Sequence, residues 1–191
     1  MATAFTRIPL VDPQSPDPEV AAVFDAIRAH GGEPLHLHRT LAQAPALLRP
    51  FLDLAFALRL NAKTPRRDRE LVILRTLQHT RGEYGFVHHR RMGLAAGLTE
   101  DQIDDLARWR DSGRFTARER ALLAYTDGMF APGGVDAPTF EAAAGHLPAP
   151  GDLVEITLTS AFYSAVAQLT NTLCIPVDDA PDGNSFNRSG R

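Results

Sequence analysis

The chain has 191 residues, of which 44% are hydrophobic and 23% are charged, and its formal net charge is -3. This balance is ordinary for a globular protein, and the lack of a basic excess argues against a nucleic-acid partner. No apolar run reaches about 18 residues and the N-terminus lacks a signal-peptide pattern, so we expect a soluble, cytoplasmic protein with no membrane span.

Helix signals follow one another along the whole chain, and no segment alternates as a strand would. Residues 1–16 are Pro-rich and are expected to be irregular. Asp17 and Pro18 then form a cap followed by a proline in the first turn, which predicts a helix that ends at Gly31. We predict a single all-α domain over residues 17–177 and a mobile tail at 178–191. The further helices are expected at about 35–44, 45–58, 65–80, 83–96, 99–109, 116–130, 138–146 and 152–173.

The two halves of the chain share a pattern. Each contains a helix, a loop rich in Gly and Pro, a short helix and a long apolar helix. Leu71 and Leu153 take similar places in the two long helices, and Tyr84 and Tyr163 do so approximately. Because these residue types are common, the pattern is only a hint of internal duplication.

Residues 69–98 hold the polar groups most suited to chemistry. Glu70 lies near the start of a predicted helix that is apolar on nearly every side, so its carboxylate is expected to be buried and to need a partner. His88 and His89 point about 100° apart on a helix, and we expect His89 to face the interior because Gly85 leaves a gap beside it. A core histidine is more often structural than catalytic, so spacing alone does not establish a site.

The same stretch resembles the carboxymuconolactone decarboxylase and alkylhydroperoxidase D (AhpD-like) family. The redox branch of that family has a glutamate, two cysteines and a histidine at fixed spacing. Glu70 and His89 match the outer positions, whereas Gly82 and Gly85 stand at the cysteines. The resemblance therefore implies an AhpD-like helical bundle of the branch that lacks the CxxC pair. It runs from about residue 38 to residue 174 and is concentrated in residues 69–75, 84–89 and 96–99.

Cys174 is the only cysteine of the chain. Neither an internal disulfide nor a two-thiol redox cycle is therefore available to one subunit, which also favours a reducing compartment. We expect Cys174 to be a small buried hydrophobic residue. A peroxidase that uses Cys174 across a subunit interface is the least favoured hypothesis.

The polar residues left from the family pattern favour acid–base chemistry. Loss of CO2 beside a carbonyl leaves an enolate-like anion, which needs hydrogen-bond donors and a proton donor but no metal or organic cofactor. We expect His89 to deliver the proton, Glu70 to orient it and Tyr84 to donate a hydrogen bond. The same set would serve an isomerase. The residues expected around the substrate are Gly82, Gly85, Phe86 and His88.

Two hypotheses follow from the resemblance and these residues. The first is a cofactor-independent lyase or isomerase that acts on a small oxygenated, carboxylated molecule. The alternative is a non-catalytic small-molecule binding or scaffold protein, which Gly82 and Gly85 favour because they remove side chains where relatives are reactive. The resemblance also implies self-association as a homotrimer or homohexamer.

Other polar groups carry weaker signals. His36 and His38 lie two residues apart, so they do not converge on one metal ion on a helix. His79, near a helix end, is favoured there as a cation. We interpret the arginines near Glu70 as surface ion-pair partners in preference to an anion-attracting mouth. They are Arg66, Arg67, Arg69, Arg75, Arg90 and Arg91.

Overall fold

The computed structural model describes residues 6–178, and every helix or strand element assigned in that range is helical, which confirms the all-α prediction. The chain divides into two compact units: residues 58–168, and residues 1–57 together with 169–191. The expected single domain over residues 17–177 stays a prediction, and nearly all of the expected mobile tail lies outside the described residues. Within residues 6–178, no helix is both long and apolar enough to cross a bilayer.

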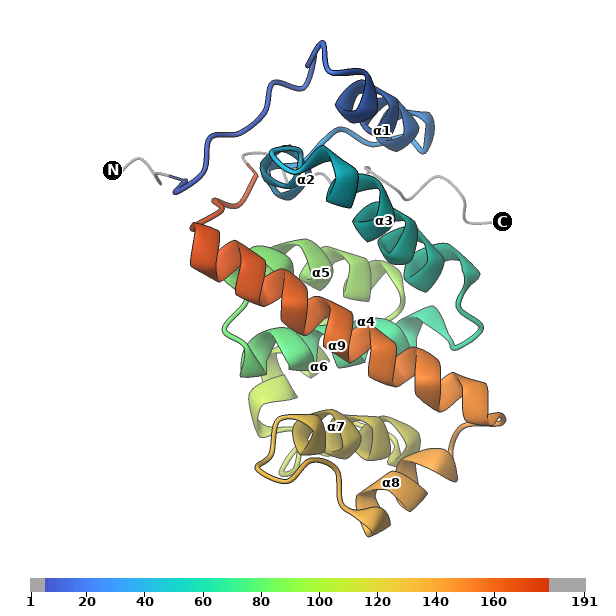
Figure 1. The fold of residues 1–191 in the computed structure, drawn as a ribbon. Helices are drawn as coiled ribbons and strands as arrows, with labels where there is room; N and C mark the ends of the chain where they lie inside the picture. The colour runs from blue at the N-terminus through green and yellow to red at the C-terminus, as the bar shows by residue number, and fades with distance from the viewer. Residues whose placement is uncertain (1–5, 179–191) are drawn as a thin grey trace, which may run out of the picture. The chain divides into compact units, whose positions relative to one another are not determined.

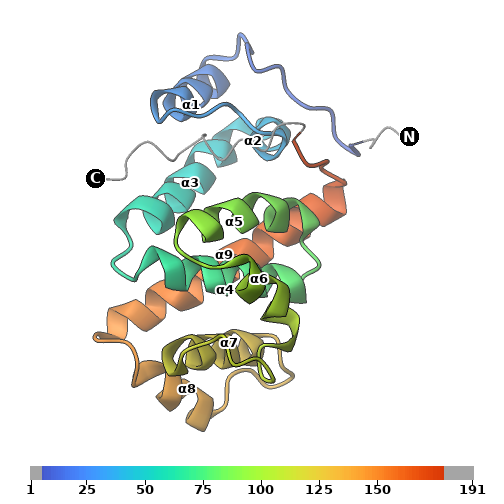
Figure 2. The ribbon, with the colours of Figure 1, turned by 180° about the vertical axis from the view of Figure 1, so that it is seen from behind.

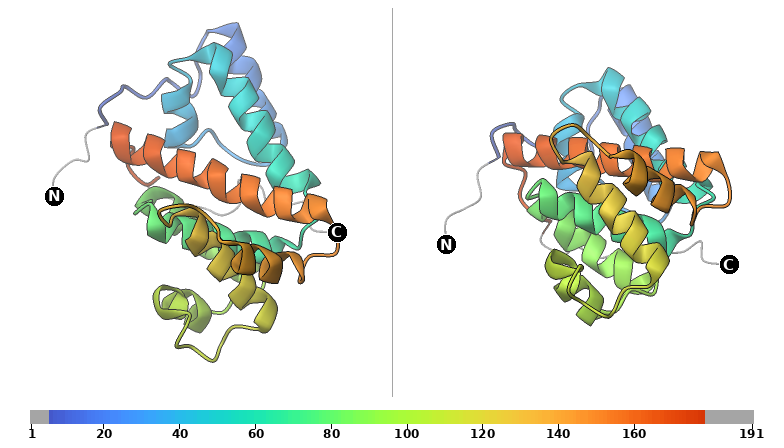
Figure 3. Two further views of the ribbon diagram at one scale, coloured as in Figure 1. Left: turned by 60° about the horizontal axis from the view of Figure 1, so that its bottom comes forward. Right: turned by 90° about the horizontal axis from the view of Figure 1, so that it is seen from below.

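The unit of residues 58–168 contains most of the helices (Figure 1). Helix α4 packs against α5 and α7, and α7 also packs against α8 (Figure 2). Helix α9 runs across α4 (Figure 3). The elements are η1 (Ala57–Asn61, a π-helix that begins one residue before the unit), α4 (Arg66–His79), α5 (Glu83–Ala95), α6 (Glu100–Asp105), η2 (Leu106–Arg108), α7 (Ala117–Met129), α8 (Ala137–Ala144) and most of α9 (Pro150–Leu173).

Helix α4 is enclosed on nearly every side, as the apolar run at residues 71–74 predicts. Leu71 and Leu74 face the α6 region, Val72 packs among side chains of α7, α8 and α9, and Leu77 contacts α9. These side chains are almost completely buried. Glu70 stands among them in the first turns of the helix, and its side chain is 0% exposed. The helix therefore carries a carboxylate into the interior.

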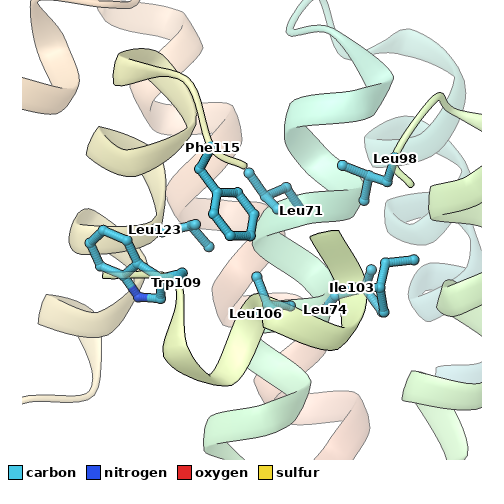
Figure 4. Close-up of a cluster of buried hydrophobic side chains, with 8 residues drawn as sticks. All are labelled: Leu71, Leu74, Leu98, Ile103, Leu106, Trp109, Phe115 and Leu123. Atoms are coloured by element: carbon cyan, nitrogen blue, oxygen red, sulfur yellow. The ribbon is translucent and has the colours of Figure 1, made fainter. Parts of the chain in front are cut away.

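One hydrophobic cluster holds α4 against the segment that leads from α5 to α7 (Figure 4). Burial of each large apolar side chain stabilises the fold by about 1.5–3 kcal/mol. This packing fixes the face of α4 that points away from α9. The members of the cluster are Leu71, Leu74, Leu98, Ile103, Leu106, Trp109, Phe115 and Leu123.

Two helices of this unit begin at capping boxes that the sequence predicts. Thr99 Oγ1 accepts a hydrogen bond from the backbone amide of Gln102, whose side chain accepts one from the amide of Thr99. Thr116 and Glu119 make the equivalent pair of bonds at α7. Two backbone amides at the start of each helix are therefore bound by side chains.

The other unit contains α1 (Pro18–Ala29), α2 (His36–Leu41), α3 (Pro45–Phe56) and the end of α9. Asp17 caps α1 by accepting hydrogen bonds from the amides of Glu19 and Val20. Helix α3 packs against α1 and α2. This unit has a core of its own, formed by Val20, Val23, Phe24, Ile27, Ala42, Leu48 and Leu52.

Candidate functional site

The centre of the candidate site is a buried contact between a carboxylate and an imidazole. Glu70 Oε2 lies 2.7 Å from His89 Nδ1, and the two side chains are 0% and 7% exposed. The other oxygen of Glu70, Oε1, pairs with Arg66, one turn earlier on α4, at 2.5 Å. The glutamate thus binds both expected kinds of partner at once, the histidine and an arginine. We call Glu70 and His89 the acid–base pair.

Electrostatics favour the ionised form of the Glu70 carboxylate. Burial raises the pKa of Glu70, but the charge and hydrogen bond of His89 and the charge of Arg66 outweigh it, so the net pKa is lowered. An ionised carboxylate only accepts hydrogen bonds, and therefore His89 must donate its Nδ1 proton to Glu70. Nε2 is then the nitrogen that releases a proton from the imidazolium form and takes one up in the neutral form.

Tyr163, on α9, completes the surroundings of His89. Its ring meets the imidazole edge-on, with ring centroids 4.5 Å apart. Burial, followed by the negative charge of Glu70, raises the pKa of Tyr163 to about 12, so the phenol keeps its proton at neutral pH. The sequence signals this residue only through the weak duplication that relates it to Tyr84.

A small cavity, which we call the arginine cavity, opens beside Tyr163 and Arg66. Its volume is about 10 Å³, about that of one water molecule. Burial, then the charge of Arg66, lowers the pKa of Arg59 to about 10. Arg69 donates to the backbone carbonyls of Arg59, Ala62 and Thr64, and so holds η1 in place. The lining residues are Leu58, Arg59, Arg66, Arg69, Ile73, Thr159 and Tyr163.

Three other residues of α5 expected at the site make contacts of their own. Tyr84 packs its ring on His88, with centroids 4.8 Å apart, and both side chains are buried. Phe86 packs against Leu77 and its neighbours. Among the ring contacts of the described residues, His89 therefore packs against Tyr163, whereas Tyr84 packs against His88.

The sequence of the central segment identifies its family. Residues 45–128 match the model of the carboxymuconolactone decarboxylase family. This segment belongs to that family. The match includes Glu70, Arg66 and His89, and it ends before Tyr163 on α9. No curated protein matches the chain.

Several solved structures share the fold of this chain. A peroxidase-related protein from Ralstonia eutropha superposes with a TM-score of 0.81 at 20% identity, covering 97% of this chain and 98% of that one. A peroxidase-related protein from Silicibacter superposes with a TM-score of 0.79 at 17% identity, covering 94% of this chain and 95% of that one. The apo debrominase Bmp8 superposes with a TM-score of 0.75 at 15% identity, covering 92% of this chain and 95% of that one. These likenesses show the AhpD-like helical fold.

The two glycines at the cysteine positions of the family's redox branch are closely packed. A Cβ atom on Gly82 would lie 2.7 Å from Leu77 Cδ2 and 2.8 Å from Ala167 Cβ, and one on Gly85 would lie 2.8 Å from Leu77 Cδ2. Contacts below 3.0 Å do not occur without a shift of the neighbours. The gap expected beside Gly85 is therefore filled by Leu77, because this leucine turns its side chain toward both glycines.

Cys174 and His79 can also be compared with what the sequence predicts. Cys174 is exposed rather than buried, because the chain leaves α9 at this residue with a positive φ of 52°. His79 does not stand alone at its helix end, since its Nε2 lies 2.7 Å from Asp127. Among the described residues, no group of three His, Cys, Asp or Glu side chains is arranged to hold a metal ion.

The ion-pair interpretation of the arginines near Glu70 is confirmed for most of them. Four of the six make salt bridges, whereas Arg69 donates to uncharged oxygen acceptors. The salt-bridge pairs are Arg66–Glu70, Arg67–Glu119, Arg75–Asp127 and Arg90–Glu100.

A larger, apolar groove lies between α7, α8 and α9. Its volume is about 750 Å³, and none of its lining residues is charged. The hydroxyl groups of Tyr125 and Thr157, 2.7 Å apart, form one polar pair in its lining. Phe140, Val154 and Leu158, which are exposed, also line it. This groove suits an apolar ligand but lacks groups for acid–base chemistry.

Proposed function

We propose that the chain is a cofactor-independent lyase or isomerase that acts on a small oxygenated, carboxylated molecule. The observation that carries the proposal is the buried 2.7 Å contact of Glu70 with His89. An ionised carboxylate that holds one nitrogen of an imidazole and leaves the other for proton transfer is a common arrangement for general acid–base catalysis. Membership of residues 45–128 in the carboxymuconolactone decarboxylase family supports the same chemistry.

Each residue has a definite role in this proposal. In a decarboxylation, the electron pair of the breaking C–C bond moves into the neighbouring carbonyl, CO2 leaves, and the carbon then takes a proton from His89 Nε2. Glu70 holds the Nδ1 proton and stabilises the imidazolium form. Tyr163 and Arg66 stabilise the developing oxyanion. The hydrogen-bonding role expected of Tyr84 is thereby assigned to Tyr163.

The test uses the full chain with a panel of carboxylated lactones and β-keto acids. Proton NMR in D2O follows both the loss of substrate and the incorporation of deuterium next to a carbonyl. We expect His89→Ala to lower the rate by about 10²–10⁴-fold, which is the usual contribution of a general acid or base. Glu70→Gln should lower it less, because the amide still accepts a hydrogen bond but has no charge.

A matched control is His79→Ala. His79 also contacts a carboxylate at 2.7 Å, but it is 26% exposed and pairs with Asp127. Its removal should leave the rate unchanged. Equal rates for His89→Ala and the wild-type chain, or a panel in which no compound reacts, would refute the lyase or isomerase proposal.

A second candidate is a non-catalytic protein that binds a small apolar molecule. The observation that favours it is the groove of about 750 Å³ with its single hydroxyl pair, which has the size and lining common among ligand pockets. Displacement of an apolar fluorescent probe, compared between the wild-type chain and Leu153→Asp, tests this candidate. Equal probe binding by the two proteins would refute it.

Assembly and location belong to the same proposal. We propose a homotrimer or homohexamer in the cytoplasm, with neither nucleic acid nor membrane as a partner. The exposed apolar side chains of Val154 and Leu158 on α9 support self-association. Light scattering coupled to size-exclusion chromatography measures the mass directly, and a monomer at micromolar concentration would refute this part.

A further inference from the structure

We propose that the apolar groove between α7, α8 and α9 binds an uncharged amphiphile with a hydroxyl group, of which a long-chain alcohol is the simplest example. The hydroxyl group of the ligand donates a hydrogen bond to Tyr125 Oη, and its apolar chain covers Phe140, Val154 and Leu158. The inference rests on the second candidate function, because it names the class of ligand that this groove takes. It does not depend on the acid–base pair.

The direction of two hydrogen bonds is the first argument. Thr157 Oγ1 lies 2.7 Å from the carbonyl oxygen of Leu153 and 2.7 Å from Tyr125 Oη. A carbonyl oxygen only accepts, so Thr157 donates its single hydroxyl proton to Leu153, and Tyr125 must therefore donate its own proton to Thr157. Both protons of the hydroxyl pair are thus in use. Tyr125 Oη keeps acceptor lone pairs, and within residues 6–178 it makes no hydrogen bond beyond the one to Thr157.

The loop between α8 and α9 is the second argument, because its residues 147–150 also line the groove. The backbone amide of Leu147 donates to the carbonyl oxygen of Ala144, and that of Ala149 donates to the carboxylate of Asp152. The prolines on either side of Ala149 have no amide proton. The hydroxyl pair and this loop therefore have no free proton to donate. A ligand that donates a hydrogen bond, such as an alcohol, is favoured over one that only accepts, such as an ether, a ketone or a carboxylate.

Charge and size are the third argument. None of the lining side chains is charged, so an ionic head group would lose its hydration without gaining a counter-charge. The volume of about 750 Å³ lies within the range of small-molecule sites. Phe140, Val154 and Leu158 are between 41% and 65% exposed. An apolar chain that lies over these side chains removes both surfaces from water, which is the main source of affinity for such a ligand.

The test compares octan-1-ol with heptyl methyl ether, which has the same atoms but no hydrogen-bond donor. Displacement of an apolar fluorescent probe from the full chain measures both affinities. We expect the ratio of the alcohol affinity to the ether affinity to fall about 2–10-fold in Tyr125→Phe, which is the usual contribution of one neutral hydrogen bond. Tyr84→Phe, which removes a tyrosine hydroxyl outside the groove lining, should leave the ratio unchanged. From hexan-1-ol to octan-1-ol, each added methylene should tighten binding about fourfold.

Thr157→Val tests the direction of the hydrogen bonds. Valine has nearly the shape of threonine but cannot accept the proton of Tyr125. This proton then becomes available to a ligand that only accepts, so the ether should bind more tightly to Thr157→Val than to the wild-type chain. The ratio of alcohol to ether affinity should therefore fall in this variant as well, although Tyr125 Oη is still present.

The outcomes separate this inference from the second candidate function. A ratio that is the same in the wild-type chain, Tyr125→Phe and Thr157→Val would overturn the inference even if Leu153→Asp abolishes probe binding. Alcohol binding that weakens as the protein concentration rises would also overturn it, because a second copy of the chain would then occupy the groove. Circular dichroism checks that each variant folds, and if one does not, the ratio in the other decides. If neither folds, octanoate that binds the wild-type chain as tightly as octan-1-ol would overturn the inference.

Discussion

The packing around Gly82 predicts a large effect of one added methyl group. In Gly82→Ala the new Cβ would lie 2.8 Å from Ala167 Cβ, which cannot retreat unless the backbone of α9 moves, and 2.7 Å from Leu77 Cδ2. Overpacking of this kind costs about 1–3 kcal/mol. Gly82 is also the N-cap of α5, where glycine is better than alanine by about 0.5–1 kcal/mol. We therefore expect the free energy of unfolding to fall by about 2–4 kcal/mol.

A double-mutant cycle isolates the contact. Ala167→Gly alone should cost about 1–2 kcal/mol through helix propensity and a lost buried methyl group. In the double variant Gly82→Ala/Ala167→Gly the methyl groups exchange places. It should therefore be more stable than the sum of the single effects predicts, by at least about 1 kcal/mol. Independent sites add to within about 0.3–0.5 kcal/mol, so this coupling is measurable.

Urea unfolding is the assay, followed by circular dichroism and by the fluorescence of Trp109. This residue is the only tryptophan and is 5% exposed, so its emission reports the unit that contains Gly82. Gly151→Ala is the matched control, since a Cβ there meets nothing within 4 Å. Its stability should be unchanged or slightly raised. Full additivity in the cycle, or a Gly82→Ala variant as stable as the wild-type chain, would refute the packing argument.

Two further predictions concern single carboxylates. Burial raises the pKa of Asp127, but hydrogen bonds from Arg75, His79 and Arg110 and the charge of Arg75 outweigh it, so the pKa is lowered to about 2. Asp127→Asn should therefore lower stability by about 1–3 kcal/mol at pH 7. Because the pKa of Asp127 in the folded protein lies below its unfolded value of 3.8, the stability difference between the two proteins should persist above pH 3.8 and shrink as the pH falls toward 2. Urea unfolding at pH 7, 5 and 3 measures this difference. A difference that stays constant over this range would contradict the lowered pKa of Asp127. Glu155 accepts hydrogen bonds from the backbone amides of residues 63 and 64. Glu155→Ala should therefore lower the free energy of unfolding by about 1–2 kcal/mol. The control Glu141→Ala, at an exposed residue of α8, should leave it almost unchanged in the same assay.

The sequence predicts the fold well because its signals are local. Capping boxes, prolines in first turns and glycines after last turns each mark a helix end within a few residues. The burial of Glu70 is also predictable, because a helix that is apolar on nearly every side has no exposed face for a polar residue. The π-helix η1 (Ala57–Asn61) has no such signal, and only its first two residues fall within the helix predicted at 45–58.

The surroundings of the site are harder to predict because they depend on contacts distant in sequence. Tyr163 reaches His89 only because α9 crosses α4, and Arg59 reaches the arginine cavity only because Arg69 holds η1 in place. The space beside Gly85 is likewise not predictable from the sequence. A glycine in the sequence suggests a gap, but a side chain from a neighbouring helix, Leu77, fills it.

The packing around the two glycines also bears on whether thiols could be introduced there. A side chain at residue 82 or 85 needs the space that the Leu77 methyl groups occupy. A leucine can move its methyl groups by changing rotamer, but Ala167 Cβ beside Gly82 moves only with the backbone of α9. A cysteine pair at these positions would therefore need an adjustment of α9 as well as two substitutions, even though Glu70 and His89 are in position.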